Sequence, residues 1–196
     1  MHEYNVGSVL KCILPYHENP LFGRMLQLLH IADTKWEFLE KCKSSGSVLS
    51  RATLVQRCIT DPSVLDFILQ LISDWPREGS VPHVVSSLLM VTVIEVLDRY
   101  RSTPDHLTRK IVAVLRHGMR RSFDRNLVSA CHAILSHLCV HTVLMPELAY
   151  KLFRAVSRHV AEESLTDAVL CLTVMSATQQ ISAFPEEGVK AFLERR

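Results

Sequence analysis

The stretch CILPYHENPLFGRMLQLLHI, residues 12–31, decides the fold because it joins a helix end directly to a helix start. Pro15 has no N–H and biases Leu14 away from helical backbone angles, so a helix that begins near Val6 is expected to end there. Pro20 fits the first turn of a second helix, which is expected to bury one broad apolar stripe. That stripe comprises Leu21, Phe22, Met25, Leu26, Leu28 and Leu29. The stretch therefore predicts a corner between two helices.

The corner itself favours a structural role, and its residues are Leu14, Pro15, Tyr16, His17 and Glu18. Tyr16 is expected to pack. His17 and Glu18 are expected at the start of the second helix, where Glu18 favours the positive end of the helix dipole. Catalysis by His17 and Glu18 is the alternative, and we consider it much the weaker one.

A second stretch, ATLVQRCITDPSVLDFILQLI, occupies residues 52–72. Together the two stretches resemble the N-terminal region of one family, HEAT repeat-containing protein 1, also called U3 small nucleolar RNA-associated protein 10. The resemblance implies that one helix opens, closes and leads into the next at fixed positions. In this sequence those positions are Thr53 and Leu54 (opening), Cys58 and Asp61 (closing), and Asp66, Phe67 and Ile68 (the next helix).

The resemblance also implies that Trp36 and residues 43–46 form a variable, loop-like join between the two stretches. After Trp75 only a helical rhythm agrees with the family, so we assign the specific signal to the first 75 residues. Members of the family are much longer than this chain. We therefore interpret the chain as an excised segment, a partial gene product or a shortened relative.

The resemblance implies a function as well. Family members are scaffolds of the small-subunit processome in the nucleolus. They support pre-18S rRNA processing and are linked to ribosomal DNA transcription. The implied partners are WD-repeat processome subunits, the U3 small nucleolar ribonucleoprotein and, through direct contact, pre-rRNA. No cofactor, small-molecule substrate or membrane is implied. A generic HEAT-repeat adaptor in another intracellular pathway is the alternative.

Composition sets independent limits. The chain has 196 residues, is 48% hydrophobic and contains only 6 Gly, which suits one globular domain or a short repeat array. A net charge of +2 does not mark a nucleic-acid-binding protein. Residues 127–146 contain no Asp, Glu, Lys or Arg and include three His, and they predict a buried helix more than a membrane span. Six scattered Cys without a C-x-x-C pair suit a reducing compartment.

The second half of the chain has an internal period. Pro104, Pro146 and Pro185 each precede or open the second helix of an expected pair, and they lie 42 and 39 residues apart (146 − 104 and 185 − 146). HEAT and armadillo repeats have periods of about 40–47 residues. We therefore expect residues 76–196 to form about three HEAT-like helix pairs, continuous with a segment of residues 1–75 in one all-α solenoid. A compact helical bundle is the alternative.

The expected core stripes of the second and third pairs follow from helical spacing. In the second pair they include Leu127, Cys131, Ile134, Leu135 and Leu138. In the third they are Leu165, Val169, Leu172 and Met175.

Catalytic and metal-binding signals are weak. The densest group of ligand-type residues comprises Cys131, His132, His137, Cys139 and His141. His137 and His141 share a helix face and are able in principle to hold a metal. However, the stretch has no H-E-x-x-H pattern, and we see no acidic residue placed to act as a base. Phosphate-binding glycine loops are also absent from the sequence. We expect no enzyme, no cofactor and no metal site.

Basic residues concentrate between Arg101 and Arg125, where seven Lys and Arg face two Asp, an excess of five. We call six of them the basic ridge: Arg109, Lys110, Arg116, Arg120, Arg121 and Arg125. Such a ridge suits RNA phosphates or an acidic protein surface. Only Tyr100 and Phe123 lie nearby to stack on bases, so we favour protein contact over RNA contact.

Overall fold

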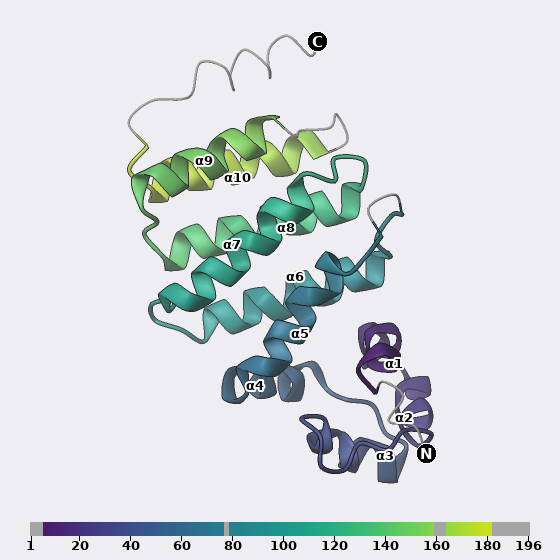
Figure 1. Cartoon of the computed structure of the whole chain (residues 1–196). Helices are drawn as coiled ribbons and strands as arrows, with labels where there is room; N and C mark the ends of the chain where they lie inside the picture. Colours follow the sequence, from purple (N-terminus) through teal and green to yellow (C-terminus); the bar gives the residue numbers. More distant parts are fainter. Residues whose placement is uncertain (1–5, 77–78, 159–163, 182–196) are drawn as a thin grey trace. The chain divides into compact units, whose positions relative to one another are not determined.

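The computed structural model describes residues 6–76, 79–158 and 164–181. Within these ranges every regular element is a helix and no strand occurs, so the predicted all-α class is confirmed for the part described. The chain divides into two compact units, Met1–Leu71 and Ile72–Arg196, which are described separately below (Figure 1). Among the same residues, no helix combines the length and the apolar character needed to cross a membrane.

The first unit is built from short helices. They are α1 (Val6–Ile13), the 3₁₀ turn η1 (Leu14–Tyr16), α2 (Pro20–Leu26), the 3₁₀ turn η2 (Glu37–Leu39), α3 (Glu40–Ser45), α4 (Arg51–Thr60) and α5 (Pro62–Ser73), which runs past the boundary of the unit. The predicted corner is present, because α1 ends just before Pro15 and Pro20 opens α2. Asn19 caps α2 by accepting a hydrogen bond from the Leu21 N–H through its side chain.

The predicted broad stripe of α2 is wrong. Only Phe22 and Leu26 of its six members are buried, while Leu21 and Leu28 are 61% and 78% exposed. The helix ends at Leu26, so Leu28 lies beyond it and shares no helical face with the others. A helix of this length buries a narrow line of residues. Gly23 belongs to that line, because a Cβ there would lie 2.4 Å from the carbonyl carbon of Gly46.

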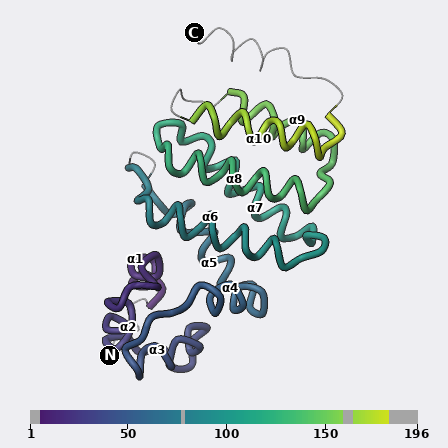
Figure 2. The backbone as a smooth tube through the Cα atoms, turned by 180° about the vertical axis from the view of Figure 1, so that it is seen from behind, coloured from purple at the N-terminus to yellow at the C-terminus, as the bar shows by residue number. Residues whose placement is uncertain are grey.

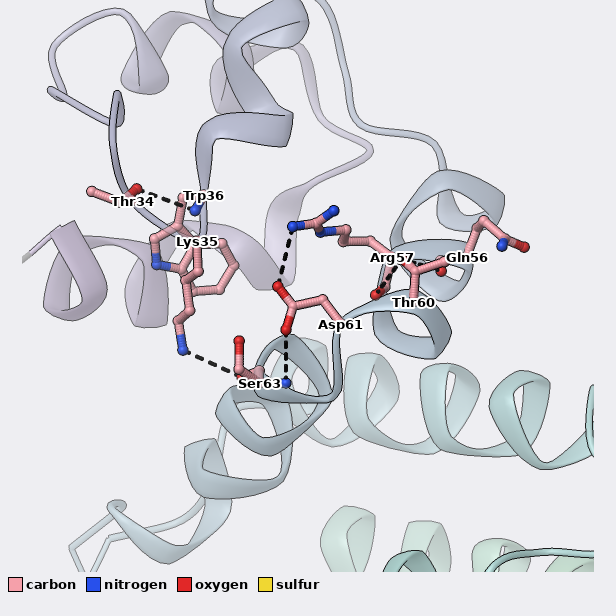
Figure 3. Close-up of polar contacts among 8 residues, drawn as sticks. All are labelled: Thr34, Lys35, Trp36, Gln56, Arg57, Thr60, Asp61 and Ser63. Atoms are coloured by element: carbon pink, nitrogen blue, oxygen red, sulfur yellow. Dashed lines mark hydrogen bonds and ion pairs between the residues drawn. The ribbon is translucent and has the colours of Figure 1, made fainter.

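The join expected around Trp36 is part of the core. The Trp36 side chain is 3% exposed, and its ring meets the Phe67 ring edge-on with 4.7 Å between centroids. The Nζ atom of Lys35 lies 5.1 Å from the Trp36 ring centre and donates a hydrogen bond to the Ser63 carbonyl (Figure 3). Trp36 lies in a turn, as the loop-like join predicted, although its side chain packs in the core. Residues 43–45 of the same predicted join instead form the end of α3 (Glu40–Ser45), so the prediction is wrong there.

Asp61 closes α4, as the family resemblance implied, and it also starts α5. One carboxylate oxygen pairs with the Arg57 guanidinium at 3.1 Å, while the other accepts a hydrogen bond from the Ser63 N–H at 3.0 Å (Figure 3). Hydrogen bonding from Ser63, helped by nearby cations, lowers the pKa of Asp61. The following helix begins at Pro62, four residues earlier than the implied opening at Asp66.

The second unit contains longer helices in two layers. They are α6 (His83–Asp98), α7 (Asp105–Met119), α8 (Arg125–His141), α9 (Pro146–Arg158) and α10 (Leu165–Thr178). Helix α8 packs between α6 and α10 in one layer, and α7 and α9 lie beside each other in the second (Figures 1 and 2). The predicted core stripe of α8 is confirmed, since all five of its residues are buried. The helix expected after Pro185 lies outside the described residues.

The predicted stripe of α10 is right at Met175 and wrong at Leu165 and Val169. Leu165 and Val169 are 40% and 43% exposed, whereas Ala168, Cys171 and Met175 are buried. The expected stripe has spacings of four, three and three, the observed one has spacings of three and four, and both consist of apolar residues. Helical periodicity cannot choose between two adjacent apolar stripes, so the packing on α8 and α9 decides it.

Two polar side chains fasten the turns of this unit to segments far away in sequence. Gln179 is buried, accepts a hydrogen bond from the Leu144 N–H and donates to the carbonyls of Cys139 and Thr142. Asp124 accepts from the Val81 N–H at 2.6 Å. These bonds satisfy backbone groups that would otherwise be buried without partners.

Candidate functional site

The outer face of α7 carries the greater part of the basic ridge. Arg109, Arg116 and Arg120 are exposed and follow one another at spacings of seven and four, which places them on one side of the helix. Ala113 occupies the position between them and is also exposed. Lys110 lies next to this line, and Arg125 opens α8 after the turn. These five cations form the exposed basic ridge.

Arg121 does not belong to the exposed surface, so its place in the predicted ridge is wrong. Its residue exposure is 4%, and its guanidinium donates hydrogen bonds to the carbonyls of Trp75, Pro76 and Gly79. A buried guanidinium needs such acceptors, because an unpaired buried charge is costly. Arg121 therefore holds the segment before α6 against the turn between α7 and α8.

Asp124 is also buried, at 2% exposure, and caps α8 through the Leu127 N–H. With Arg121 and Asp124 both buried, the stretch from Arg101 to Arg125 exposes six basic residues and one acidic residue, Asp105. The excess of five positive charges thus remains at the surface (six minus one). The electrostatic field of these exposed charges attracts phosphate groups or an acidic protein surface.

Aromatic side chains near this surface are few but present. Phe123 is 60% exposed, and the Arg121 guanidinium carbon lies 5.5 Å from its ring centre. On α9, which packs beside α7, Tyr150 is 45% exposed and Lys151 is exposed as well. The arrangement suits contact with charged groups more than stacking on successive bases.

A groove of about 540 Å³ lies along the other layer and is lined by residues of α6, α8 and α10. His132 of α8 lines it with 1% exposure, and neither ring nitrogen has a hydrogen-bond partner among the described residues. Burial lowers the pKa of His132 to about 4, so the ring is neutral at pH 7. Beside it, the Ser129 hydroxyl donates to the Asp167 carboxylate at 2.5 Å, which links α8 to α10.

The ligand-type residues of α8 separate into different environments. Cys131 and Cys139 are buried, and burial raises the pKa of each thiol to about 12, so both remain protonated core residues. His137 and His141 instead meet Asp98, the last residue of α6. The sequence analysis missed this carboxylate, because no local pattern connects two positions about 40 residues apart.

The five corner residues also take individual places. Leu14 is fully buried and Pro15 lies within η1. Tyr16 is 50% exposed, so the expectation that it packs in the core is wrong. His17 is buried and bonds to Leu49, while Glu18 pairs with Arg51 at 3.1 Å. Both lie before the α2 cap, Asn19, which corrects their expected place in that helix.

Comparison with known proteins gives matches along the whole chain. A family model described as U3 small nucleolar RNA-associated protein 10 matches residues 107–196. HEAT repeat-containing protein 1 of Danio rerio is 25% identical over 92% of the chain, and the human protein of that name gives the same values. U3 small nucleolar RNA-associated protein 10 of Aspergillus oryzae is 23% identical over 98% of the chain.

These matches confirm the resemblance and extend it to the second half of the chain. The family model matches the second half, where our sequence analysis recognised only a helical rhythm. The chain spans about a tenth of the length of these relatives, 9% of the zebrafish and human proteins and 11% of the fungal one. None of the matched names indicates an enzymatic family.

Proposed function

Because this chain is homologous to HEAT repeat-containing protein 1 and U3 small nucleolar RNA-associated protein 10 over most of its length, we propose that it is a non-catalytic helical-repeat scaffold in small-subunit ribosome biogenesis. That homology is the observation that carries the proposal. In this role the chain acts in pre-18S rRNA processing within the nucleolus. Its partners are the U3 small nucleolar ribonucleoprotein and WD-repeat subunits of the processome.

The proposed architecture is an α-solenoid of HEAT-like units. Support comes from the order of the second unit, in which α6, α8 and α10 form one layer and α7 and α9 the other. The openings of α7 and α9 at Pro104 and Pro146 add the expected period. Each helix pair buries its apolar stripe against the next pair, so the outer faces are left for partners. Continuity of this solenoid with residues 1–75 stays a prediction.

The exposed basic ridge is the proposed contact surface: Arg109, Lys110, Arg116, Arg120 and Arg125. An acidic surface of a processome protein is the favoured partner, and direct contact with pre-rRNA phosphates is the second. Either contact weakens as salt is added, because both depend on unscreened charge. Phosphate contacts produce a steep dependence, since each neutralised phosphate releases counterions.

A pull-down from nucleolar extract tests the proposal. The tagged chain is incubated with the extract, and the bound proteins and RNA are identified together. We expect processome proteins with U3 RNA and 5′ pre-rRNA. Recovery of another pathway without pre-ribosomal material would overturn the ribosomal role and leave the generic HEAT-repeat adaptor as the better account.

A matched pair of variants then tests the ridge. The first carries Arg109→Glu, Arg116→Glu and Arg120→Glu. The control carries Arg24→Glu, Lys41→Glu and Arg99→Glu, three exposed positions outside the ridge with the same total change in charge. We expect the ridge variant to lose its partners and the control to keep them. Equal losses in the two variants would mean that overall charge, and not the ridge, determines recovery.

A further inference from the structure

Three side chains from two helices converge at one end of the α6–α8 layer. His141 Nε2 lies 3.1 Å from Asp98 Oδ1, and His137 Nδ1 lies 3.5 Å from the same oxygen. The three ligand-type atoms all lie within 4.8 Å of one another. His137 and His141 are four residues apart on α8, so their rings project from successive turns of one face, and their planes differ by only 17°.

We propose that Asp98, His137 and His141 form a binding site for Zn²⁺. Tetrahedral zinc with bonds of about 2.0–2.1 Å to nitrogen and oxygen holds neighbouring ligand atoms about 3.4 Å apart. The two measured separations of 3.1 and 3.5 Å fall on either side of that value. The separations of the two imidazole nitrogens from Asp98 Oδ1 therefore suit coordination of one shared tetrahedral ion.

The state of His137 supports a bound ion. Its Nδ1 atom is shielded from solvent and makes no hydrogen bond. A shielded nitrogen that makes no hydrogen bond carries a desolvation cost, which coordination to a metal removes. The neighbouring His141 ring keeps its own contact with Asp98, so both imidazoles are directed toward a single carboxylate.

The donor set selects the class of metal. Two imidazoles and one carboxylate suit zinc and other late first-row divalent ions, whereas Mg²⁺ and Ca²⁺ prefer oxygen ligands alone. The three side chains are 24–48% exposed, so the ion has access from solvent. Three protein ligands leave one position of a tetrahedral ion for water.

Because Asp98, His137 and His141 lie on two helices, a bound ion affects how these helices are held together. Asp98 is the last residue of α6, and His141 is the last residue of α8. A bound ion therefore fastens the carboxyl ends of two helices that are neighbours in one layer. Because zinc binds the folded arrangement and not the separated helices, it raises the thermal stability of the chain.

The test uses the full chain carrying Cys12→Ser, which removes the only one of the six free cysteines that is exposed. Zinc affinity and stoichiometry are measured by competition with a chromophoric chelator, and Co²⁺ is added to look for the visible absorption of a tetrahedral site. We expect one ion per chain and a rise in Tm with zinc. Mg²⁺ is expected to produce neither effect.

Variants assign the ligands. We expect His141→Ala and Asp98→Asn each to weaken zinc binding by at least about tenfold and to abolish the rise in Tm. Asp98→Asn preserves the shape of the side chain, so its effect is separable from misfolding, which far-ultraviolet circular dichroism monitors in both variants. His106→Ala, an exposed histidine on α7, is the control and is expected to bind like the parent. Equal affinity in parent, His141→Ala and Asp98→Asn, or absence of binding in the parent, would overturn the site.

Discussion

His17 and Leu49 exchange two hydrogen bonds across 32 residues of sequence. The Nδ1 atom of His17 donates to the Leu49 carbonyl at 2.8 Å, and the Leu49 N–H donates to the His17 carbonyl at 2.9 Å. Both residues are buried, with exposures of 5% and 2%. The corner between α1 and α2 is therefore held to the segment that leads into α4. The histidine of this corner is a structural residue whose partner lies outside the motif.

The first prediction concerns the hydrogen bond from the His17 side chain to the Leu49 carbonyl. His17→Ala leaves the Leu49 carbonyl without its side-chain donor, so we expect the free energy of unfolding to fall by about 2 kcal/mol. Urea denaturation followed by tryptophan fluorescence in a Trp75→Phe background, which leaves Trp36 as the remaining tryptophan, measures the loss in the first unit. Tyr16→Ala, at the exposed neighbouring position, is the control and is expected to change stability by less than about 0.5 kcal/mol. Equal effects of the two substitutions would show that the bond adds nothing to the corner.

The second prediction concerns Gly118, where α7 approaches α8. A Cβ at this position would lie 2.5 Å from the Cys131 sulfur, so Gly118→Ala is expected to destabilise the fold by about 1–3 kcal/mol through overpacking. Adding Cys131→Ala removes the sulfur and is expected to recover part of that loss. A double-mutant cycle in urea measures the coupling between the two positions. Additive effects would contradict the close approach. Gly79→Ala, where a Cβ meets its first neighbour at 3.6 Å, serves as the control.

The third prediction compares the effect on stability of replacing the buried Arg121 with that of replacing its exposed neighbour Arg120. Arg121→Ala removes a buried guanidinium and the hydrogen bonds that it donates to the carbonyls of Trp75, Pro76 and Gly79, and we expect a loss of about 2–3 kcal/mol in the free energy of unfolding. Arg121→Lys is expected to recover little of it, because an ammonium group lacks the planar fork of a guanidinium. Arg120→Ala is expected to leave stability within about 0.5 kcal/mol, since that side chain is exposed. Similar losses at the two positions, measured by chemical denaturation, would contradict the anchoring role.

The fourth prediction concerns pH. Burial lowers the pKa of His132 from 6.5 to about 4, with Asp167 acting in the opposite direction. The unfolded chain therefore takes up the proton at a higher pH than the folded chain. The stabilisation is fully present above pH 6.5 and is lost as the pH falls to about 4, by about 3 kcal/mol in total.

The variant His132→Leu removes this one histidine and isolates its contribution from those of the other titrating groups. We expect its free energy of unfolding, measured in urea at several pH values, to depend less on pH between 6.5 and 4 than that of the parent chain. Parallel pH profiles for the two proteins would show that His132 is accessible to protons in the folded state.

Local signals in the sequence were sufficient to predict the corner of the first unit and the starts of two helices of the second. Pro15 and Pro20 predicted the corner, and Pro104 and Pro146 predicted the starts of α7 and α9 to within a residue. Such predictions succeed because proline lacks a backbone N–H and has a fixed φ. Both properties restrict the local backbone whatever the tertiary packing is. The prediction of the buried stripe of α10 failed for the opposite reason. Which residues of that helix are buried depends on which neighbouring helices cover them.

The candidate site likewise has one part that local sequence predicts and another that depends on packing between distant segments. The exposure of Arg109, Arg116 and Arg120 follows from their helical spacing, which a sequence contains. The burial of Arg121 follows from carbonyl acceptors 42–46 residues earlier, and the meeting of Asp98 with His141 spans 43 residues. Nothing in the local sequence distinguishes Arg121 from Arg120. Only the packing of one turn against a distant segment decides which of the two arginines is exposed.

The most direct test of the proposed function measures 18S rRNA production in the cells from which the chain comes. The native protein is depleted, and the protein containing this chain is restored as wild type, with Arg109→Glu, Arg116→Glu and Arg120→Glu, or with the matched control substitutions Arg24→Glu, Lys41→Glu and Arg99→Glu. We predict that depletion lowers 18S rRNA and accumulates unprocessed pre-rRNA, and that the wild type and the control restore processing while the ridge variant does not. Unchanged 18S rRNA and pre-rRNA after depletion would contradict the account.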